Sequence, residues 1–447
     1  SAEEFISSDD GIYNFREAGI YLQEELSFDD TYFLTLAVRN DYSSVLGVEA
    51  PNIFYPRISG AVRLDKYDFT PGFMNFLKLR FGYGESGQLP GLRAASALRW
   101  DGGTSGYGVG VDIYSIGNPG IVPERIRELE FGTEIEFLNK YGVDFTYYLQ
   151  NADKSIVYVQ NAPSTGMTHS TVPRNLGEIE VWGFETSLYA NPIQTEDFDL
   201  NLNLILNYQD DKIIETGMEQ PYIIGPGRQG WHEGYRRASF ISYKVLGAEF
   251  NENGVYTGPE VSDEVMYIGN PVPEYTGSFS ANINLFKVFT VSGLFEWATN
   301  LSVYNYTHFA MINNGNDIEY NNLVEQVIGT DGPPALTPGT DEYINAAEKL
   351  AKLDRGYSSN FVEKADWLRF RELALRVDAY DWLEPYFGDV FRQFSIAFSV
   401  RNLALWSNYG GMDPEVTYFG GSGTGRGADL FTLPNPRTYS FSLNLGL

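Results

Sequence analysis

The stretch FDLNLNLILNY, Phe198 to Tyr208, carries the pattern that decides the fold. Leucine recurs at every second position from Leu200 to Leu206, and asparagine fills most positions between. Successive side chains of a β-strand point to opposite faces, so the leucines share one face and Asn201, Asn203 and Asn207 the other. The stretch predicts a strand of a transmembrane β-barrel, with leucine against lipid and asparagine toward a water-filled lumen.

A second stretch alternates in the same way with charge in place of amides. In RELEFGTEIEF, Arg127 to Phe137, apolar residues alternate with glutamates. A soluble β-sandwich would have to bury those carboxylates or leave a wide apolar face in water, and both are costly. Lipid outside and water inside satisfy both faces. We therefore expect the lumen wall to include Glu128, Glu130, Glu134 and Glu136.

The end of the sequence, RTYSFSLNLGL from Arg437 to Leu447, continues this alternation to its last residue. We interpret it as the closing strand of the barrel, because an open sheet edge cannot be left in hydrocarbon and must pair on both sides. The residues expected against lipid are Tyr439, Phe441, Leu443, Leu445 and Leu447.

Composition excludes several classes of protein. The 447 residues hold 31 Lys and Arg against 59 Asp and Glu, a net charge of -28, which argues against nucleic acid as a partner. There is no Cys, so thiolate metal sites and cysteine nucleophiles are excluded. The 31 Tyr, 30 Phe and 46 Gly are typical of an all-β protein with aromatic girdles. No convergent set of catalytic groups stands out, so we expect no enzyme.

About thirteen candidate strands alternate with short and long connections. Short links, such as 28–30, 139–142, 191–197, 287–288 and 380–392, alternate with long segments at 88–125, 161–176, 217–273, 301–366 and 403–437. Short periplasmic turns and long extracellular loops are the signature of an outer-membrane barrel. The candidate strands are 14–28, 31–43, 54–65, 76–86, 127–137, 143–160, 177–190, 198–208, 275–286, 289–300, 367–378, 393–402 and the last stretch.

The long segments hold the candidate binding residues. Loop aromatics are candidates to stack on sugar rings or peptide side chains, and equally to pack the loops or meet a partner: Trp100, Tyr107, Trp231, Tyr235 and Tyr320. Two acidic loop segments are weak candidates to bind Ca²⁺ through side-chain oxygens of Asp317, Glu319, Asp331 and Asp341. Neither loop has the spaced pattern that defines a calcium site, which favours plain solvated acidic loops and no cofactor.

Two further features concern packing. The stretch 341–355 is the one good helical segment, with apolar residues along one side, and is expected within an extracellular loop. Trp367 and Trp406 lie at strand ends, where an interfacial aromatic belt is expected.

Six segments, in order, resemble the SusC/RagA-like branch of the TonB-dependent outer-membrane transporters. They are FLKLRFGYGESGQLPG (76–91), GNPGIVPERIRELEFGTEIEF (117–137), NLGEIEVWGFETSL (175–188), IGNPVPEYTGSFSANI (268–283), ADWLRFRELAL (365–375) and RNLALWSNYGGMDPEV (401–416). The resemblance implies a 22-stranded barrel with a plugged lumen. About thirteen strands remain here, so we expect residues 1–447 to be the carboxyl-terminal part of that barrel, without its plug, TonB box and first strands.

The resemblance also implies a function and partners. The expected function is active import of an oligosaccharide or a peptide across the outer membrane of a Gram-negative bacterium. The expected partners are a SusD-like surface lipoprotein, the TonB complex acting through the amino-terminal part, the rest of the barrel as a separate chain or upstream region, and outer-membrane lipid. The alternatives are a passive porin, an adhesion or assembly barrel, and a soluble glycan-binding β-protein.

Overall fold

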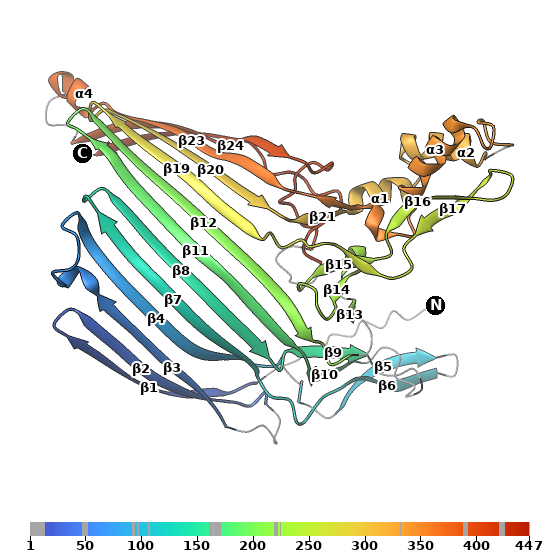
Figure 1. Ribbon diagram of the computed structural model, residues 1–447, viewed down its shortest axis with the longest axis horizontal. Coiled ribbons are helices and arrows are strands. Elements are labelled where there is room, and N and C mark those ends of the chain that lie inside the picture. Colours follow the sequence, from blue (N-terminus) through green and yellow to red (C-terminus); the bar gives the residue numbers. More distant parts are fainter. Residues whose placement is uncertain are drawn as a thin grey trace, which may run out of the picture. The chain divides into compact units, whose positions relative to one another are not determined.

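The computed structural model describes residues 14–46, 52–91, 94–95, 98–105, 108–160, 164, 171–218, 222–223, 225–330, 332–387, 392–419 and 425–446. Its main element is a 13-stranded antiparallel sheet with the order β1-β2-β3-β4-β7-β8-β11-β12-β19-β20-β23-β24-β26 (Figure 1). In this order each strand lies beside its predecessor in the chain, with only loop strands intervening, as in an up-and-down barrel wall.

All thirteen strands expected from the alternation are present. They are β1 (Glu17–Phe28), β2 (Tyr32–Ser43), β3 (Ile53–Arg63), β4 (Met74–Gln88), β7 (Glu124–Phe137), β8 (Tyr141–Asp153), β11 (Glu178–Gln194), β12 (Phe198–Glu215), β19 (Tyr275–Leu285), β20 (Phe289–Thr299), β23 (Trp367–Asp378), β24 (Gln393–Ser407) and β26 (Thr438–Gly446). Leu447, expected against lipid, lies outside the described residues.

Several of the short connections are tight hairpin turns. Three of them place two consecutive residues at positive φ: Asp29 and Asp30, Leu138 and Asn139, and Phe286 and Lys287. Two such residues form turns whose twist matches that of the flanking strands, which explains how hairpins close within a few residues. The other short connections are 64–73, 195–197 and 379–392, and the last contains helix α4 (Tyr380–Phe387).

The long connections carry structure of their own. Their strands are β5 (Leu98–Ser105), β6 (Gly108–Ile116), β9 (Ile156–Gln160), β10 (Thr171–Asn175), β13 (Tyr222–Ile223), β14 (Gln229–Trp231), β15 (Ser239–Ser242), β16 (Val245–Phe250), β17 (Tyr256–Val261), β18 (Met266–Gly269), β21 (Ser302–Asn305), β22 (Val362–Lys364) and β25 (Ala428–Asp429). Their helices are α1 (Tyr306–Asn313), α2 (Ile318–Val327) and α3 (Asp341–Ala351). Short 3₁₀ turns lie at Leu64–Lys66, Pro226–Arg228 and Ser358–Asn360.

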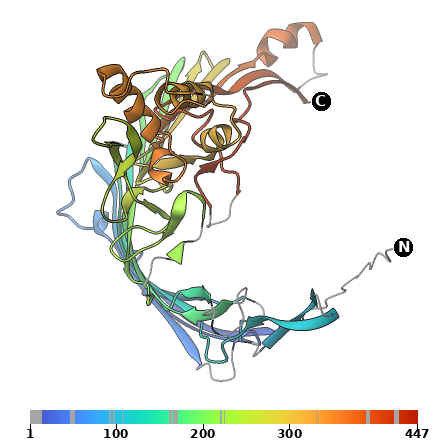
Figure 2. The ribbon, with the colours of Figure 1, turned by 90° about the vertical axis from the view of Figure 1, so that its right-hand side faces the viewer.

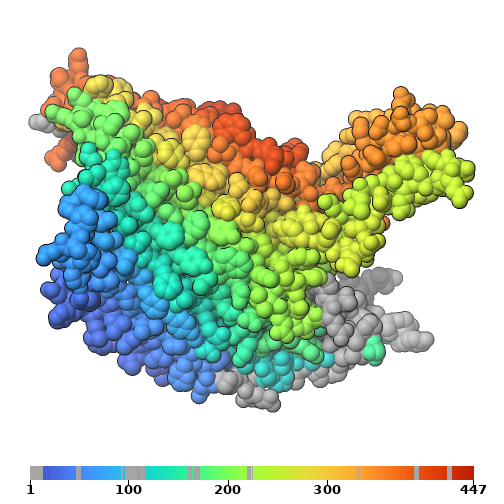
Figure 3. All heavy atoms as spheres, viewed as in Figure 1, coloured from blue at the N-terminus to red at the C-terminus, as the bar shows by residue number. Residues whose placement is uncertain are grey.

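Two compact units are distinguishable, one of 1–62, 80–130 and 150–179, and one of 63–79, 131–149 and 180–447. Within the second unit, α4 lies at one end of the strands β12 to β24, and the loop elements lie at the other (Figure 1). Figure 2 turns this loop end toward the viewer, with α1 to α3 in front of the strands. Hairpin β16–β17 and helices α2 and α3 form one projecting arm (Figure 3).

The loop structure corrects two expectations. The strand expected over 143–160 ends at Asp153, and Ile156–Gln160 instead forms β9, which pairs with β10. The helix expected at 341–355 is present as α3, but it is not the one helical segment, because α1, α2 and α4 accompany it. No helix in the described part of the chain is long and apolar enough to cross a membrane.

Candidate functional site

The pairing register of six neighbouring strands, β12 to β26, sorts their side chains into two faces, because directly paired residues of antiparallel strands lie on the same face. One row of paired residues is apolar throughout: Leu200, Ile283, Val291, Leu375, Phe398 and Phe441. The next row, one residue along each strand, is polar or small: Asn201, Asn282, Ser292, Ala374, Ser399 and Ser440. We call these the apolar face and the polar face of the sheet.

Aromatic rings mark two levels of the apolar face. Toward the loop end, the Tyr208 ring contacts the rings of Phe184 and Tyr275, with centroids 5.7 and 4.8 Å away. Near the short-turn end, Phe198 pairs with Leu285, and Leu285 with Phe289. Ten residues of strand separate these levels, about 33 Å along the strand and about 25 Å once the strand is tilted. That height matches the apolar band of an outer-membrane barrel.

The asparagines and glutamates expected to line the lumen alternate with apolar residues along β12 and β7, so they lie on the opposite face of each strand. Asn201, Asn203 and Asn207 are on the polar face, paired with Asn282, Ser280 and Thr276. On β7, Glu128 accepts a hydrogen bond from Gln150 Nε2 at 3.0 Å, and Glu134 lies 3.1 Å from Lys78 Nζ. Glu130 and Glu136 are exposed. That this face lines a hydrated lumen stays a prediction.

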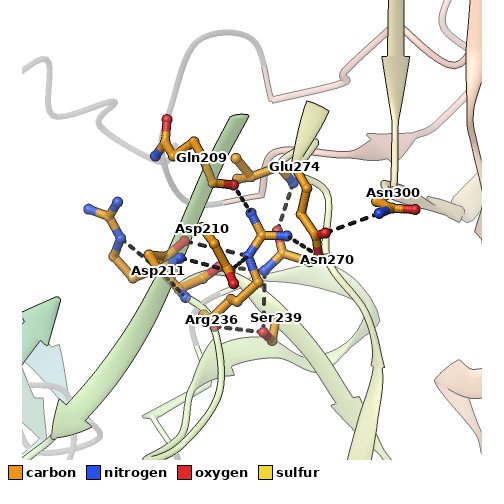
Figure 4. A network of polar contacts seen from close by, with 10 residues as sticks. Gln209, Asp210, Asp211, Arg236, Ser239, Asn270, Glu274 and Asn300 are labelled. Atoms are coloured by element: carbon orange, nitrogen blue, oxygen red, sulfur yellow. Dashed lines mark hydrogen bonds and ion pairs between the residues drawn. The ribbon is translucent and has the colours of Figure 1, made fainter. Parts of the chain in front are cut away.

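At the loop end of β12, Arg236 holds a network of carboxylates (Figure 4). Its Nε lies 3.0 Å from Asp210 Oδ1 and 3.7 Å from Asp211 Oδ1, in ion pairs without hydrogen-bond alignment. Its Nη1 lies 3.4 Å from Glu274 Oε1, just before β19. Asp211 and Arg236 are buried, so their charges are little screened by solvent. The network ties the β13–β18 loop to the ends of β12 and β19.

Backbone groups complete this network. Arg237 N donates to Asp211 Oδ2 at 2.7 Å, and Asn270 Nδ2 donates to Arg237 O at 2.7 Å (Figure 4). Ser239 Oγ donates to Arg236 O at 2.6 Å. Asn270 is 1% exposed, and hydrogen bonds of both its amide N and O to the backbone fix the path of the loop there.

A second charged network ties the loop after β24 to the polar face. Arg369 Nη2 lies 2.6 Å from Asp413 Oδ1, and the two side chains are 3% and 1% exposed. Arg371 Nη2 lies 2.7 Å from Glu415 Oε1, and its Nε pairs with Glu296 on β20. Glu372 pairs with Leu294 of β20 and Phe370 with Phe295, so Arg371 is the extra residue of a β-bulge against β20. The bulge shifts the alternation of β23 by one residue, so Arg369 pairs with Glu296 on the polar face although Leu373 and Leu375, also at odd positions, are on the apolar face.

Trp367 belongs to this second network and not to the expected interfacial belt. It pairs with Ala298 and Ser407, and its ring lies 5.9 Å from the guanidinium carbon of Arg369 and 5.7 Å from that of Arg371. The expectation for Trp367 is wrong, because the cationic pair and a small buried cluster take the ring to the polar side. Trp406 is 53% exposed and pairs with Leu368, and its place in a belt stays a prediction.

A third contact links the same loop to α1. Tyr409 OH donates to Asp429 Oδ2 at 3.0 Å, and Thr307 Oγ1 donates to the Asp429 backbone oxygen at 3.1 Å. Burial, and then the neighbouring Asp429 carboxylate, raise the pKa of the Tyr409 hydroxyl far above its ordinary value. Tyr409 therefore stays a hydrogen-bond donor at any physiological pH.

The candidate loop aromatics do not gather at one place in the described structure. Tyr235 contacts His232 and Tyr267, with ring centroids 4.7 and 6.0 Å away, and Trp231 ends β14. Tyr320 lies on α2 and packs against two apolar clusters of the loop assembly, which favours a packing role. Trp100 lies on β5, whose side chains are outside the described structure, as is all of Tyr107.

Most of the acidic Ca²⁺ candidates occupy helix starts. The Asp317 side chain caps α2 by accepting from Tyr320 N, and it lies 3.4 Å from His308 Nε2. Glu319 and Asp341 fall in the first turns of α2 and α3, where carboxylates favour the positive end of the helix dipole. Asp331 is outside the described residues. No group of three or more potential ligands occurs among the residues that are described.

Sequence reasoning did not identify the arginine networks, although several of their residues lie in segments that it had quoted. Arg369 and Arg371 are in ADWLRFRELAL, and Asp413 and Glu415 are in RNLALWSNYGGMDPEV. Asn270 and Glu274 of the first network are in IGNPVPEYTGSFSANI. Charged residues inside membrane-strand motifs were the available signal, but pairing across 44 positions is visible only in the folded chain.

Comparison with known proteins gives concordant results. Residues 3–403 match the family model described as TonB dependent receptor-like, beta-barrel. The chain is 24% identical over 474 residues to TonB-dependent receptor P26 of Formosa agariphila, covering 96% of this chain and 46% of that protein. It is 22% identical over 464 residues to TonB-dependent receptor SusC of Bacteroides thetaiotaomicron, covering 93% and 42%.

Solved structures show the same fold. The RagAB peptide importer in its closed-closed state superposes with a TM-score of 0.76 at 19% identity, over 96% of this chain and 47% of that one. The chain thus spans about half the length of the relatives that it matches.

Proposed function

Because this chain belongs to the TonB dependent receptor-like, beta-barrel family, we propose that it forms the barrel wall of a SusC-like active importer in the outer membrane of a Gram-negative bacterium. Members of the family are receptors and transporters and not enzymes. The observation that carries the proposal is the sheet itself, which has an apolar face one membrane thick and a polar face to which loops are tied by buried arginines.

The rest of the barrel is part of the proposal. Among the described residues β1 pairs only with β2, and β26 only with β24. An unpaired strand edge in hydrocarbon leaves backbone groups without hydrogen bonds. We propose that further strands complete the wall on both sides, and that a plug and a TonB-contacting segment outside these residues supply the coupling to TonB.

The proposed partner is a SusD-like surface lipoprotein that covers the extracellular mouth. The support is the likeness to SusC and to the RagAB importer. The loop assembly at one end of the strands, with the arm of β16–β17, α2 and α3, is the part of this chain that such a partner would meet.

The proposed cargo is a neutral oligosaccharide or a peptide. RagAB is described as a peptide importer, and relatives named SusC and P26 leave the class of cargo open for this chain. The net charge of -28 disfavours polyanionic cargo, since like charges repel in a confined mouth. Sulfated or uronic-acid polymers are therefore the least suitable class.

Uptake in living cells tests this proposal. We expect a strain that lacks the gene to lose import of one class among labelled neutral oligosaccharides and peptides, and loss of TonB to abolish the same import. Import that persists without TonB would support the alternative, a passive porin. Efficient import of a sulfated or uronic-acid polymer would contradict the proposed cargo.

A further inference from the structure

Helix α4 lies in the connection between β23 and β24, at the end of the strands opposite the loop assembly (Figure 1). It is fixed close to the strands by its flanks, because Ala379 N donates to Phe394 O at 3.0 Å and Asp378 N donates to Val288 O at 2.7 Å. The connections 138–140, 195–197 and 286–288 at this end of the second unit need only three residues each, so a helix is not required to join two neighbouring strands there.

The helix carries large aromatic side chains that the described chain leaves uncovered. Trp382 is 52% exposed and Tyr386 is 82% exposed. They are four positions apart, so they lie on the same side of the helix. The charged residues Asp381 and Glu384 fall on a different side. Because the described chain buries neither aromatic side chain, this side of α4 can contact lipid or another molecule.

This aromatic side continues the apolar face of the sheet. The Trp382 ring meets the Phe289 ring edge to face, with centroids 5.8 Å apart. Phe289 is in the row of Phe198, Leu285, Val377 and Ile396, which closes the apolar band at its short-turn end. Trp382 therefore lies at the level where hydrocarbon gives way to headgroups.

We infer that α4 is an interfacial helix whose Trp382 and Tyr386 side chains lie in the phospholipid headgroup layer of the leaflet nearest the short turns. Trp and Tyr combine an apolar ring with a polar group and so prefer this layer. Asp381 and Glu384 remain on the aqueous side. Contact with Phe289 argues for lipid as the occupant, because the surface on which Trp382 rests is continuous with the lipid-covered face.

Depth measurements with nitroxide labels test this inference in the full-length protein in phospholipid bilayers. Residues 1–447 hold no cysteine, so once any cysteine elsewhere in the full-length protein is replaced by serine, Tyr386→Cys, Glu384→Cys and Leu373→Cys each give one labelling site. Leu373 is 39% exposed and lies near mid-height on the apolar face, as a reference for bilayer contact. We expect collision with a water-soluble nickel chelate to be several-fold lower at 386 than at 384, and oxygen collision at 386 to lie between those at 384 and 373.

Three results would overturn it. Equal nickel access at 386 and 384 would place α4 in water. Low access to both nickel and oxygen at 386 would show a protein surface covering the helix. If the label at 373 also lay in water, the membrane placement of the sheet would fail together with the helix, which separates that failure from the first two.

A second variant needs no label. Trp382→Phe keeps an aromatic ring against Phe289 and removes one indole. With lipids brominated close to the headgroup, we expect the unmodified protein to lose more tryptophan fluorescence than the Trp382→Phe protein. Equal fractional quenching of the two would contradict the inference.

Discussion

The loop assembly buries its apolar side chains in internal clusters, whereas the sheet exposes them on one face. In the loops, Tyr343, Phe361 and Phe240 are each 0% exposed and form internal clusters. In the sheet, the apolar face is open to its surroundings, with Phe441 70% exposed and Leu373 39% exposed. The loops thus fold around cores of their own, as soluble domains do, whereas the sheet relies on lipid to cover one face.

This difference decides what a substitution does. A side chain on the apolar face contacts fluid lipid. The cost of a substitution there depends on the polarity of the new side chain and on its depth in the bilayer. A side chain in the loops, or in the arginine networks that attach them to the sheet, contacts protein. The cost of a substitution there depends on whether it leaves a buried polar or charged group without its partner.

The largest expected effect is at the second arginine network. Arg369→Ala leaves Asp413, which is 1% exposed, without its cation, and we expect a loss of about 3 to 5 kcal/mol in the free energy of unfolding. Urea unfolding in lipid vesicles measures it. The control is Arg401→Ala on the same sheet: its pair with Glu372 is 64% and 30% exposed, and we expect a loss of at most about 1 kcal/mol. Similar losses would mean that burial does not set the difference.

The next effect is on the apolar face. Leu204→Arg places a charge at mid-height against lipid, and we expect a cost of about 2 to 4 kcal/mol. Asn203→Arg, one residue away on the polar face, is the matched control and should be mild. Both are measured by unfolding in the same vesicles. Equal costs would contradict the assignment of lipid to one face and water to the other.

A smaller effect is expected within the arm. The Thr340 side chain caps α3 by accepting a hydrogen bond from Tyr343 N at 3.3 Å. Thr340→Ala should destabilise the helix by about 1 kcal/mol, and Thr340→Ser should restore it. Hydrogen exchange of α3 amides reports the change, while the amides of β12 should be unaffected if the arm has its own core. Parallel changes in both would show that arm and sheet unfold together.

The smallest effect is a titration. Burial is the main cause that raises the pKa of Tyr256 to about 12 from its ordinary 10.0. A raised pKa means that the folded arm disfavours the phenolate, so this contribution to stability is complete below pH 10 and is lost as pH rises through 12. Ultraviolet difference spectra should show a late tyrosine that Tyr256→Phe removes. If Tyr256→Phe instead removed absorbance that titrates near pH 10, the raised pKa of Tyr256 would be contradicted.

The strands and their faces were predictable because alternation is a local property. Leu200 to Leu206 and Tyr439 to Leu445 show their faces without knowledge of any neighbour, and the pairing register confirms that both runs lie on one face. The same argument failed for Trp367, since a bulge at Arg371 and two guanidinium groups set its position.

By itself, the sequence determined the number and order of the long strands, the alternation of short turns with long loops, and helix α3. These features follow from hydrophobic periodicity and from turn residues, which are properties of consecutive positions. Tertiary structure alone decided the loop assembly. It placed helices α1 and α2 and paired β21 with β25 in parallel. It also formed the ion pairs by which Arg236 and Arg369 fix their loops, and all these contacts join residues far apart in the chain. Such contacts follow from which surfaces meet and exclude water, and no local pattern encodes them.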